Sequence, residues 1–152
     1  MDEGIRHREI GVLAPLIGYH LRRAQGAFVV DFAEALEGTG MRQILVGILA
    51  VISHQPGINQ GAAGRILDIK RANMVSLINE LVVARLVYRL VDDQDRRAFS
   101  LNLTEAGEVM LKECLERIKT HESRMLEGFS DEELLQLREL LGRIARRIPI
   151  ED

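Results

Sequence analysis

A short charged segment, flanked by two strand-like runs and followed at once by a capped helix, constrains most strongly what this chain can fold into. Residues 86–91 and 98–103 are both short runs rich in β-branched or aromatic residues. Only charged and amide side chains stand between them, at positions 92–97. Thr104 then offers a hydroxyl that can cap a helix beginning at Glu105. The segment therefore predicts a β-hairpin with a charged tip that leads directly into a helix.

Periodic apolar residues predict helices on both sides of this hairpin. The expected bounds, in chain order, are residues 13–36, 41–54, 58–67, 70–86 and 104–128, followed by a last helix that Ser130 and Glu133 open as a capping box. Pro15 is expected in the first turns of the first helix, and Thr39 is expected to cap the second. The helix over residues 70–86 is expected to bury Met74, Leu77, Ile78 and Leu81. Two helices joined by a tight turn and followed by a hairpin predict a winged helix-turn-helix.

The order of residues through the hairpin resembles the signature of the multiple antibiotic resistance regulator (MarR) family of transcriptional regulators. Asp95 and Arg97 stand as Asp-x-Arg, and Leu101-x-Leu103-Thr104-x-x-Gly107 follows them. The predicted helices also fall in the order that such proteins use, so the resemblance extends over residues 13–148.

The resemblance implies a mainly α fold with a small β-hairpin wing, in one domain over residues 1–152. Residues 41–103 are expected to form the winged helix-turn-helix lobe that binds DNA, and residues 8–36 and 104–150 the helical dimerisation lobe of an intertwined homodimer. A two-fold dimer matches a palindromic operator in double-stranded DNA. The length of 152 residues and the hydrophobic content of 47% suit one domain with a buried core.

Base-reading residues are expected near the start of the second helix of the helix-turn-helix, which enters the major groove N-terminus first. The candidates are Lys70, Arg71, Asn73, Val75 and Ser76. Arg71 is suited to a paired contact with guanine and Asn73 to one with adenine. The alternative interpretation is that Lys70 and Arg71 only begin a solvated helix.

The wing supplies the second set of DNA-binding candidates. The family motif implies that Arg97 lies in or beside the minor groove and that Asp95 pairs with it to hold its direction. Arg96 and Arg89 are expected to contact phosphates. The alternative is an exposed ion pair at the hairpin tip, worth about 0 to 1 kcal/mol.

Regulators of this family usually hold a small ligand between the dimerisation lobe and the DNA-binding lobe. Candidate ligand-binding residues, from the helices that the resemblance places there, are Tyr19, His20, Arg23, Phe28 and His54. Aromatic surface beside an arginine suggests an aromatic acid or its coenzyme A thioester. The alternative is that these residues serve packing, the interface and a solvated face. The function expected is a ligand-responsive repressor.

The charge balance permits DNA binding but does not demand it. The net charge is −3, although basic residues outnumber acidic ones over residues 58–97. This distribution predicts modest nonspecific affinity for DNA. A winged-helix module that binds a protein partner is therefore an open alternative.

Other function classes find little support in the sequence. No glycine loop for phosphate, nucleophile elbow or clustered zinc ligands are found, so neither an enzyme nor a bound cofactor or metal is expected. No apolar run is long enough to span a bilayer, which together with a single cysteine predicts a cytoplasmic protein. Sensing through Cys114, or through a metal held by His121 and His54, is the remaining alternative within the same fold.

Overall fold

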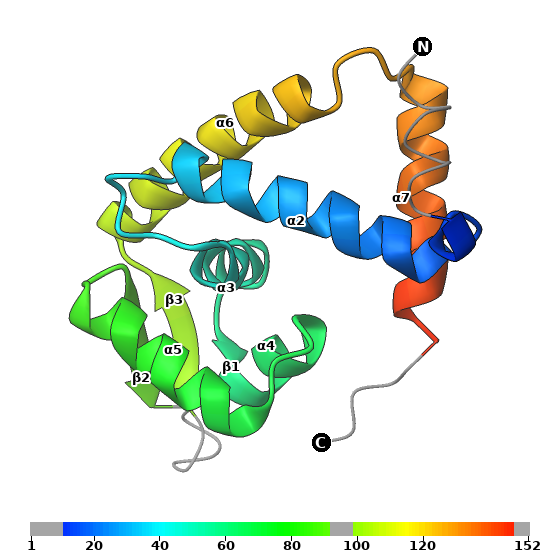
Figure 1. The fold of residues 1–152 in the computed structure, drawn as a ribbon. Coiled ribbons are helices and arrows are strands. Elements are labelled where there is room, and N and C mark those ends of the chain that lie inside the picture. Colours follow the sequence, from blue (N-terminus) through cyan, green and yellow to red (C-terminus); the bar gives the residue numbers. More distant parts are fainter. Residues whose placement is uncertain (1–10, 92–98, 148–152) are drawn as a thin grey trace.

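The computed structural model, which describes residues 11–91 and 99–147, is mainly helical, with a small antiparallel sheet at one side (Figure 1). The elements in chain order are the short 3-10 helix η1 (Gly11–Leu13), α2 (Ile17–Ala35), α3 (Gln43–His54), β1 (Ile58–Asn59), α4 (Gln60–Ile66), α5 (Arg71–Val83), β2 (Val87–Val91), β3 (Phe99–Leu103), α6 (Glu105–Met125) and α7 (Asp131–Ala145). The mainly α fold with a hairpin after the helix-turn-helix of α4 and α5 is thus confirmed. No helix in the described ranges is long and apolar enough to cross a membrane.

The sheet has one more strand than the sequence predicted. Its order is β1-β3-β2, and all pairings are antiparallel. Residues 58–67 were expected to be helical throughout, but Ile58 pairs with Leu101 as part of β1. Ile58 is buried there, and Asn59 remains extended because its side chain caps α4 by accepting from the Ala62 amide at 2.8 Å.

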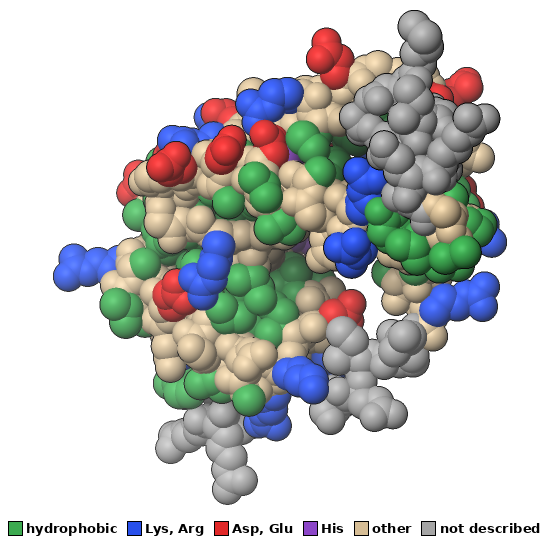
Figure 2. Space-filling model, viewed as in Figure 1, with side chains coloured by type: hydrophobic (Ala, Val, Ile, Leu, Met, Phe, Trp, Pro, Cys, Tyr) green, Lys and Arg blue, Asp and Glu red, His purple; other side chains and the backbone are tan. Residues whose placement is uncertain are grey.

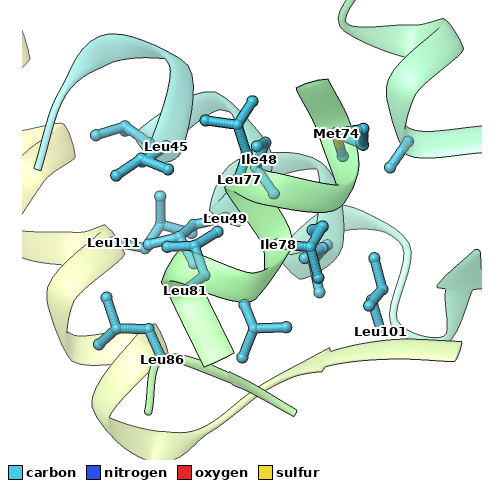
Figure 3. Packing of buried hydrophobic residues seen from close by; sticks show 14 of the residues in the cluster. Leu45, Ile48, Leu49, Met74, Leu77, Ile78, Leu81, Leu86, Leu101 and Leu111 are labelled. Atoms are coloured by element: carbon cyan, nitrogen blue, oxygen red, sulfur yellow. The ribbon is translucent and has the colours of Figure 1, made fainter. Parts of the chain in front are cut away.

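The core lies where α3, α5 and α6 meet the sheet (Figure 3). The predicted inner face of α5 is confirmed, since Met74, Leu77, Ile78 and Leu81 are all buried. They pack in one cluster with Ile48 and Leu49 of α3, Leu101 of β3 and Leu111 of α6. Apolar burial of this kind is the main favourable contribution to folding.

The start of α6 is locked onto the turn between α5 and β2. The Thr104 hydroxyl accepts from the Gly107 amide at 2.9 Å, as the predicted cap requires, and donates to the Arg85 carbonyl at 2.7 Å. The Thr104 amide donates to the Leu86 carbonyl at 3.0 Å. A Cβ on Gly107 would overlap that same carbonyl oxygen of Leu86. The Thr-x-x-Gly part of the family signature therefore has a structural role.

Two predicted details at the ends of α2 and α3 were wrong. Pro15 precedes α2 instead of lying in its first turns, because the N-cap residue Leu16 is extended and the helix begins only at Ile17. Thr39 does not cap α3, whose N-cap residue is Arg42. The Thr39 hydroxyl instead donates to the Leu36 carbonyl at 2.6 Å and accepts from the Met41 amide at 3.0 Å, which closes the turn that follows α2.

Candidate functional site

The predicted base-reading residues lie together at the start of α5. Lys70 is its N-cap residue, and Arg71, Asn73, Val75 and Ser76 follow, all of them exposed. The opposite stripe of α5 is buried in the core, so these side chains lie on the solvent side. The first turn of α5 contains no acidic residue. This face therefore offers basic side chains, which can bind phosphates, and the amide of Asn73, which can hydrogen-bond to a base edge.

Two arginines from other elements contact the second half of α5. Arg42 makes two hydrogen bonds to the Glu80 carboxylate, at 2.5 and 2.7 Å. The bond lowers the pKa of the Glu80 carboxyl and raises that of Arg42. Arg89 of β2 donates to the Asn79 side-chain oxygen at 2.7 Å. Arg89 was expected to contact phosphates; it is half-buried and engaged with α5, and the phosphate contact stays a prediction.

The strands β2 and β3 of the wing are described as far as the pair Val91 and Phe99. Asp95, Arg96 and Arg97 lie outside the described residues, and their roles stay predictions.

The candidate ligand-binding residues fall in three places. Tyr19, His20 and Arg23 lie near the start of α2, where the Tyr19 and His20 rings meet edge to face with centroids 5.7 Å apart. The Arg23 guanidinium lies 5.9 Å from the Tyr19 ring centroid. Phe28 lies further along α2, where its ring meets that of His121 on α6. His54 is exposed at the C-terminal end of α3. Their assignment to a ligand stays a prediction.

His121, which the sequence analysis named only as an alternative metal ligand, is buried and joins α2 to α6. His121 is 2% exposed, and its Nδ1 contacts the Asp31 carboxylate. The rings of Phe28 and Phe32 meet its ring edge to face, each with a centroid distance of 5.5 Å. Arg124 also donates to Asp31 and is the main cause that lowers the pKa of that carboxyl, followed by His121. His121 Nε2 has no hydrogen-bond partner within the described part of the chain.

The spacing along α6 contains a signal for this histidine. Leu111, Cys114, Ile118 and His121 follow one another at intervals of three and four residues. Residues at that spacing share one helix face, so a histidine that continues an apolar stripe is expected inside. Of the two carboxylates on α2, Asp31 and Glu34, it is Asp31 that contacts His121.

The alternative sensing residues are not arranged for sensing. Cys114 is fully buried in the core of its own chain, where burial, and next the Glu113 charge, raise the pKa of its thiol. A thiol with a raised pKa is a poor peroxide target. Within the described residues, no group of three or more His, Cys, Asp or Glu side chains is placed to hold a metal.

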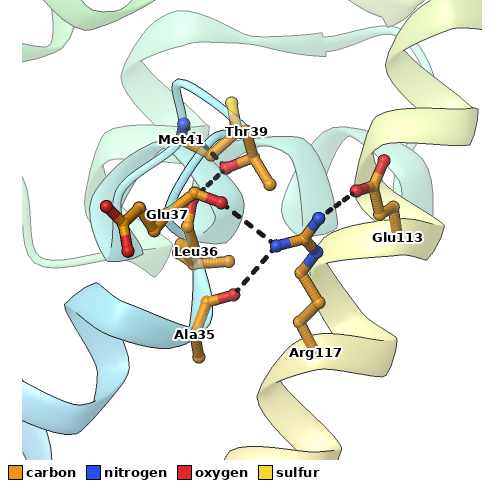
Figure 4. A network of polar contacts seen from close by, with 7 residues as sticks. All are labelled: Ala35, Leu36, Glu37, Thr39, Met41, Glu113 and Arg117. Atoms are coloured by element: carbon orange, nitrogen blue, oxygen red, sulfur yellow. Dashed lines mark hydrogen bonds and ion pairs between the residues drawn. The ribbon is translucent and has the colours of Figure 1, made fainter.

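Arg117 of α6 ties the end of α2 to α6 (Figure 4). Its guanidinium donates to the Glu37 carbonyl at 3.1 Å and to the Ala35 carbonyl at 3.4 Å, and it pairs with Glu113 at 2.8 Å. These carbonyls lie at the C-terminal end of α2, where helical partners are missing. The connection between α2 and α3 is therefore fixed to α6.

An open hollow on α7 does not suit an anionic ligand. Its lining consists of Ser130, Glu132, Glu133, Leu135, Gln136 and Glu139. Three carboxylates at this position would repel a carboxylate or phosphate.

Apolar side chains remain exposed on the helices outside the core (Figure 2). Neither α2 nor α7 contains a buried residue. Exposed residues at the start of the described chain are Val12, Leu13, Leu16 and Ile17, and those on α7 are Leu135, Leu137, Leu140, Leu141 and Ile144. Apolar stripes of this size are expected to be shielded from water by another molecule when the protein functions.

The chain is similar in sequence to known transcriptional regulators. Residues 40–98 match the MarR family. Over 138 residues the chain is 32% identical to the regulatory protein assigned to the hcr operon of Thauera aromatica, and the match covers 90% of this chain and 83% of that protein.

Two solved structures of the transcriptional repressor CouR have the same fold. One is CouR bound to a 23-mer DNA duplex, with a TM-score of 0.85 and 30% identity, over 90% of this chain and 96% of that one. The other is CouR from Rhodococcus jostii RHA1 bound to p-coumaroyl-CoA, with a TM-score of 0.80 and 29% identity, over 93% of this chain and 99% of that one.

Proposed function

The chain belongs to the MarR family of DNA-binding transcriptional regulators, which are not enzymes, and on that premise we propose that it is a homodimeric repressor that a small aromatic ligand releases from its operator. The observation that carries the proposal is the exposed face of α5, where Arg71, Asn73, Val75 and Ser76 stand clear of the core. The related repressor CouR has been solved on DNA. We assign residues 41–103 to the DNA-binding lobe and residues 8–36 and 104–150 to the dimerisation lobe.

Operator binding tests this assignment. The variants Arg71→Ala and Arg97→Ala are each expected to weaken operator binding about tenfold or more, because a good base contact or a minor-groove arginine contributes about 1–3 kcal/mol. Arg138→Ala, on α7 and away from the proposed DNA-binding face, is the matched control and is expected to bind like the wild type, provided that sedimentation equilibrium shows that this variant of the proposed dimerisation lobe is still a dimer. Gel-shift titration at fixed salt measures all three.

The possible outcomes separate the alternatives. Unchanged operator affinity of Arg97→Ala would show that the wing does not contact the DNA. Unchanged operator affinity of Arg71→Ala would show the same for the start of α5. A wild-type chain that selects no operator, with no salt dependence of DNA binding, favours the protein-interaction module.

A second copy of this chain is the proposed cover for the exposed helices. The exposed apolar residues of η1, α2 and α7 lie outside the proposed DNA-binding lobe, which buries a core of its own. A two-fold dimer through these helices also places two α5 helices for the two halves of a palindromic site.

The effector is proposed to be an aromatic acid or its coenzyme A thioester. CouR, 29% identical to this chain, has been solved with p-coumaroyl-CoA. The arginines Arg22 and Arg23 flank Tyr19 on α2 and offer positive charge beside an aromatic ring. We therefore place the ligand near Tyr19, His20 and Arg23, with Phe28 and His54 as further candidates.

A thermal-shift screen tests the effector class. A ligand that binds only the native protein raises the melting temperature. At a free ligand concentration of about a hundred times its dissociation constant, the native state is stabilised by about 2.7 kcal/mol. Aromatic acids and their coenzyme A esters are expected to give such a shift and to release the operator, whereas an aliphatic acyl-CoA of equal charge is the control. No shift across the panel would contradict the ligand class and leave the DNA assignment intact.

A further inference from the structure

The apolar stripe of α5 determines which face of this helix is buried, but a small roll of the helix would leave the same residues buried. Met74, Leu77, Ile78 and Leu81 hold it by apolar burial, which has no preferred direction. The N-cap residue Lys70 makes no side-chain capping hydrogen bond. Contacts with a defined geometry are needed to fix the direction in which the base-reading face points.

Two neighbouring residues of α5 supply such contacts on two sides of the helix. Asn79 and Glu80 are separated by about 100° around the helix axis. Asn79 accepts from Arg89 of β2 at 2.7 Å, and Glu80 accepts two hydrogen bonds from Arg42, which precedes α3. One contact therefore links α5 to the wing, and the other links it to α3.

The geometry of these contacts resists rotation. A guanidinium bound to both oxygens of a carboxylate is directional as well as attractive. The backbone of Arg89 is also held in place, because in the sheet it pairs with the buried Leu101 of β3. A side-chain tip lies about 5–6 Å from the helix axis, so a roll of about 10° moves it by about 1 Å. A displacement of this size breaks a base contact that requires about 3 Å.

We propose that Asn79 and Glu80 are positioning residues, held by Arg89 and Arg42, that set the rotation of α5 and couple it to the wing. This inference rests on the proposed DNA-binding function. Ser76 lies three residues before Asn79 and four before Glu80, so it shares the outer face of α5 with them. The contacts thus act on the residues assigned to base reading, and this proposal replaces the predicted phosphate contact of Arg89 with a role inside the protein.

The contacts themselves are tested without DNA. Double-mutant cycles in urea unfolding, for Arg89→Ala with Asn79→Ala and for Arg42→Ala with Glu80→Ala, are expected to show coupling, because the second substitution in each pair removes nothing further. Additive effects in both cycles would overturn the proposal whether or not the protein binds an operator.

Operator affinity then separates positioning from direct contact. Asn79→Ala and Arg89→Ala are each expected to weaken operator binding about fivefold per half-site, or about 25-fold for a dimer, with the double variant no weaker than either. Affinity for an unrelated duplex and the salt slope are expected to stay unchanged, so the specificity ratio falls. Asn102→Ala on β3, which lies outside both pairs, is the matched control.

The opposite pattern has a distinct signature. If Arg89 binds a phosphate directly, Arg89→Ala lowers affinity for every duplex and reduces the salt slope by about 0.9 per protomer, whereas Asn79→Ala has no effect. That result overturns the positioning role and leaves the DNA-binding function standing. A wild-type protein that binds no operator overturns both.

Discussion

Gly107→Ala is expected to destabilise the protein by about 3 kcal/mol or more, which is the upper range for overpacking a core. A Cβ at this position would stand well inside 3.0 Å of the Leu86 carbonyl oxygen, a separation that real Cβ atoms do not reach. The obstacle is backbone, so no side-chain rotamer can relieve it. The helix α6 would have to move away from the turn before β2, which breaks the two hydrogen bonds of Thr104 to that turn.

Urea unfolding followed by circular dichroism measures the loss, and Gly61→Ala is the matched control. Gly61 lies in α4, and a Cβ there would meet its nearest neighbour at 3.5 Å, an ordinary contact. Alanine favours a helix by about 1 kcal/mol over glycine, so the control is expected to be neutral or stabilising. Equal stability of Gly107→Ala and the wild type would show that α6 does not depend on this close approach.

Features set by local chemistry could be predicted from the sequence. The caps at Thr104 and Ser130 and the buried face of α5 depend on neighbouring residues, and all three are confirmed. The strand at Ile58 was missed because its partner, Leu101, lies far away in the chain. Pairing between distant residues can override a local helical pattern, and the sequence around Ile58 alone does not predict such pairing.

The candidate site shows the same division. The exposed residues at the start of α5 follow directly from the period of its apolar stripe. The contacts of Arg42 and Arg89 with the same helix could not be predicted, because they depend on how three elements pack. A charged side chain in a DNA-binding lobe suggests a phosphate contact, but its position can give it a partner within the protein instead.

Leu140→Glu is expected to dissociate the proposed dimer and with it to abolish operator binding at ordinary concentrations. Leu140 lies on α7, 45% exposed within one chain, on a helix without any buried residue. In a two-fold interface the substitution is present twice. If each unpaired carboxylate costs roughly 3 kcal/mol, the dimer dissociation constant rises roughly 10⁴-fold.

Sedimentation equilibrium measures the oligomeric state, and Leu90→Glu is the matched control. Leu90 has a similar exposure of 52%, but it lies in β2, outside the proposed dimerisation lobe, so its variant is expected to remain dimeric. A monomeric Leu140→Glu that keeps its helical content should bind one half-site weakly, because each monomer carries a single α5. A dimer of undiminished stability would show that α7 is not part of the interface, and the exposed residues of η1 and α2 would then have to account for dimerisation.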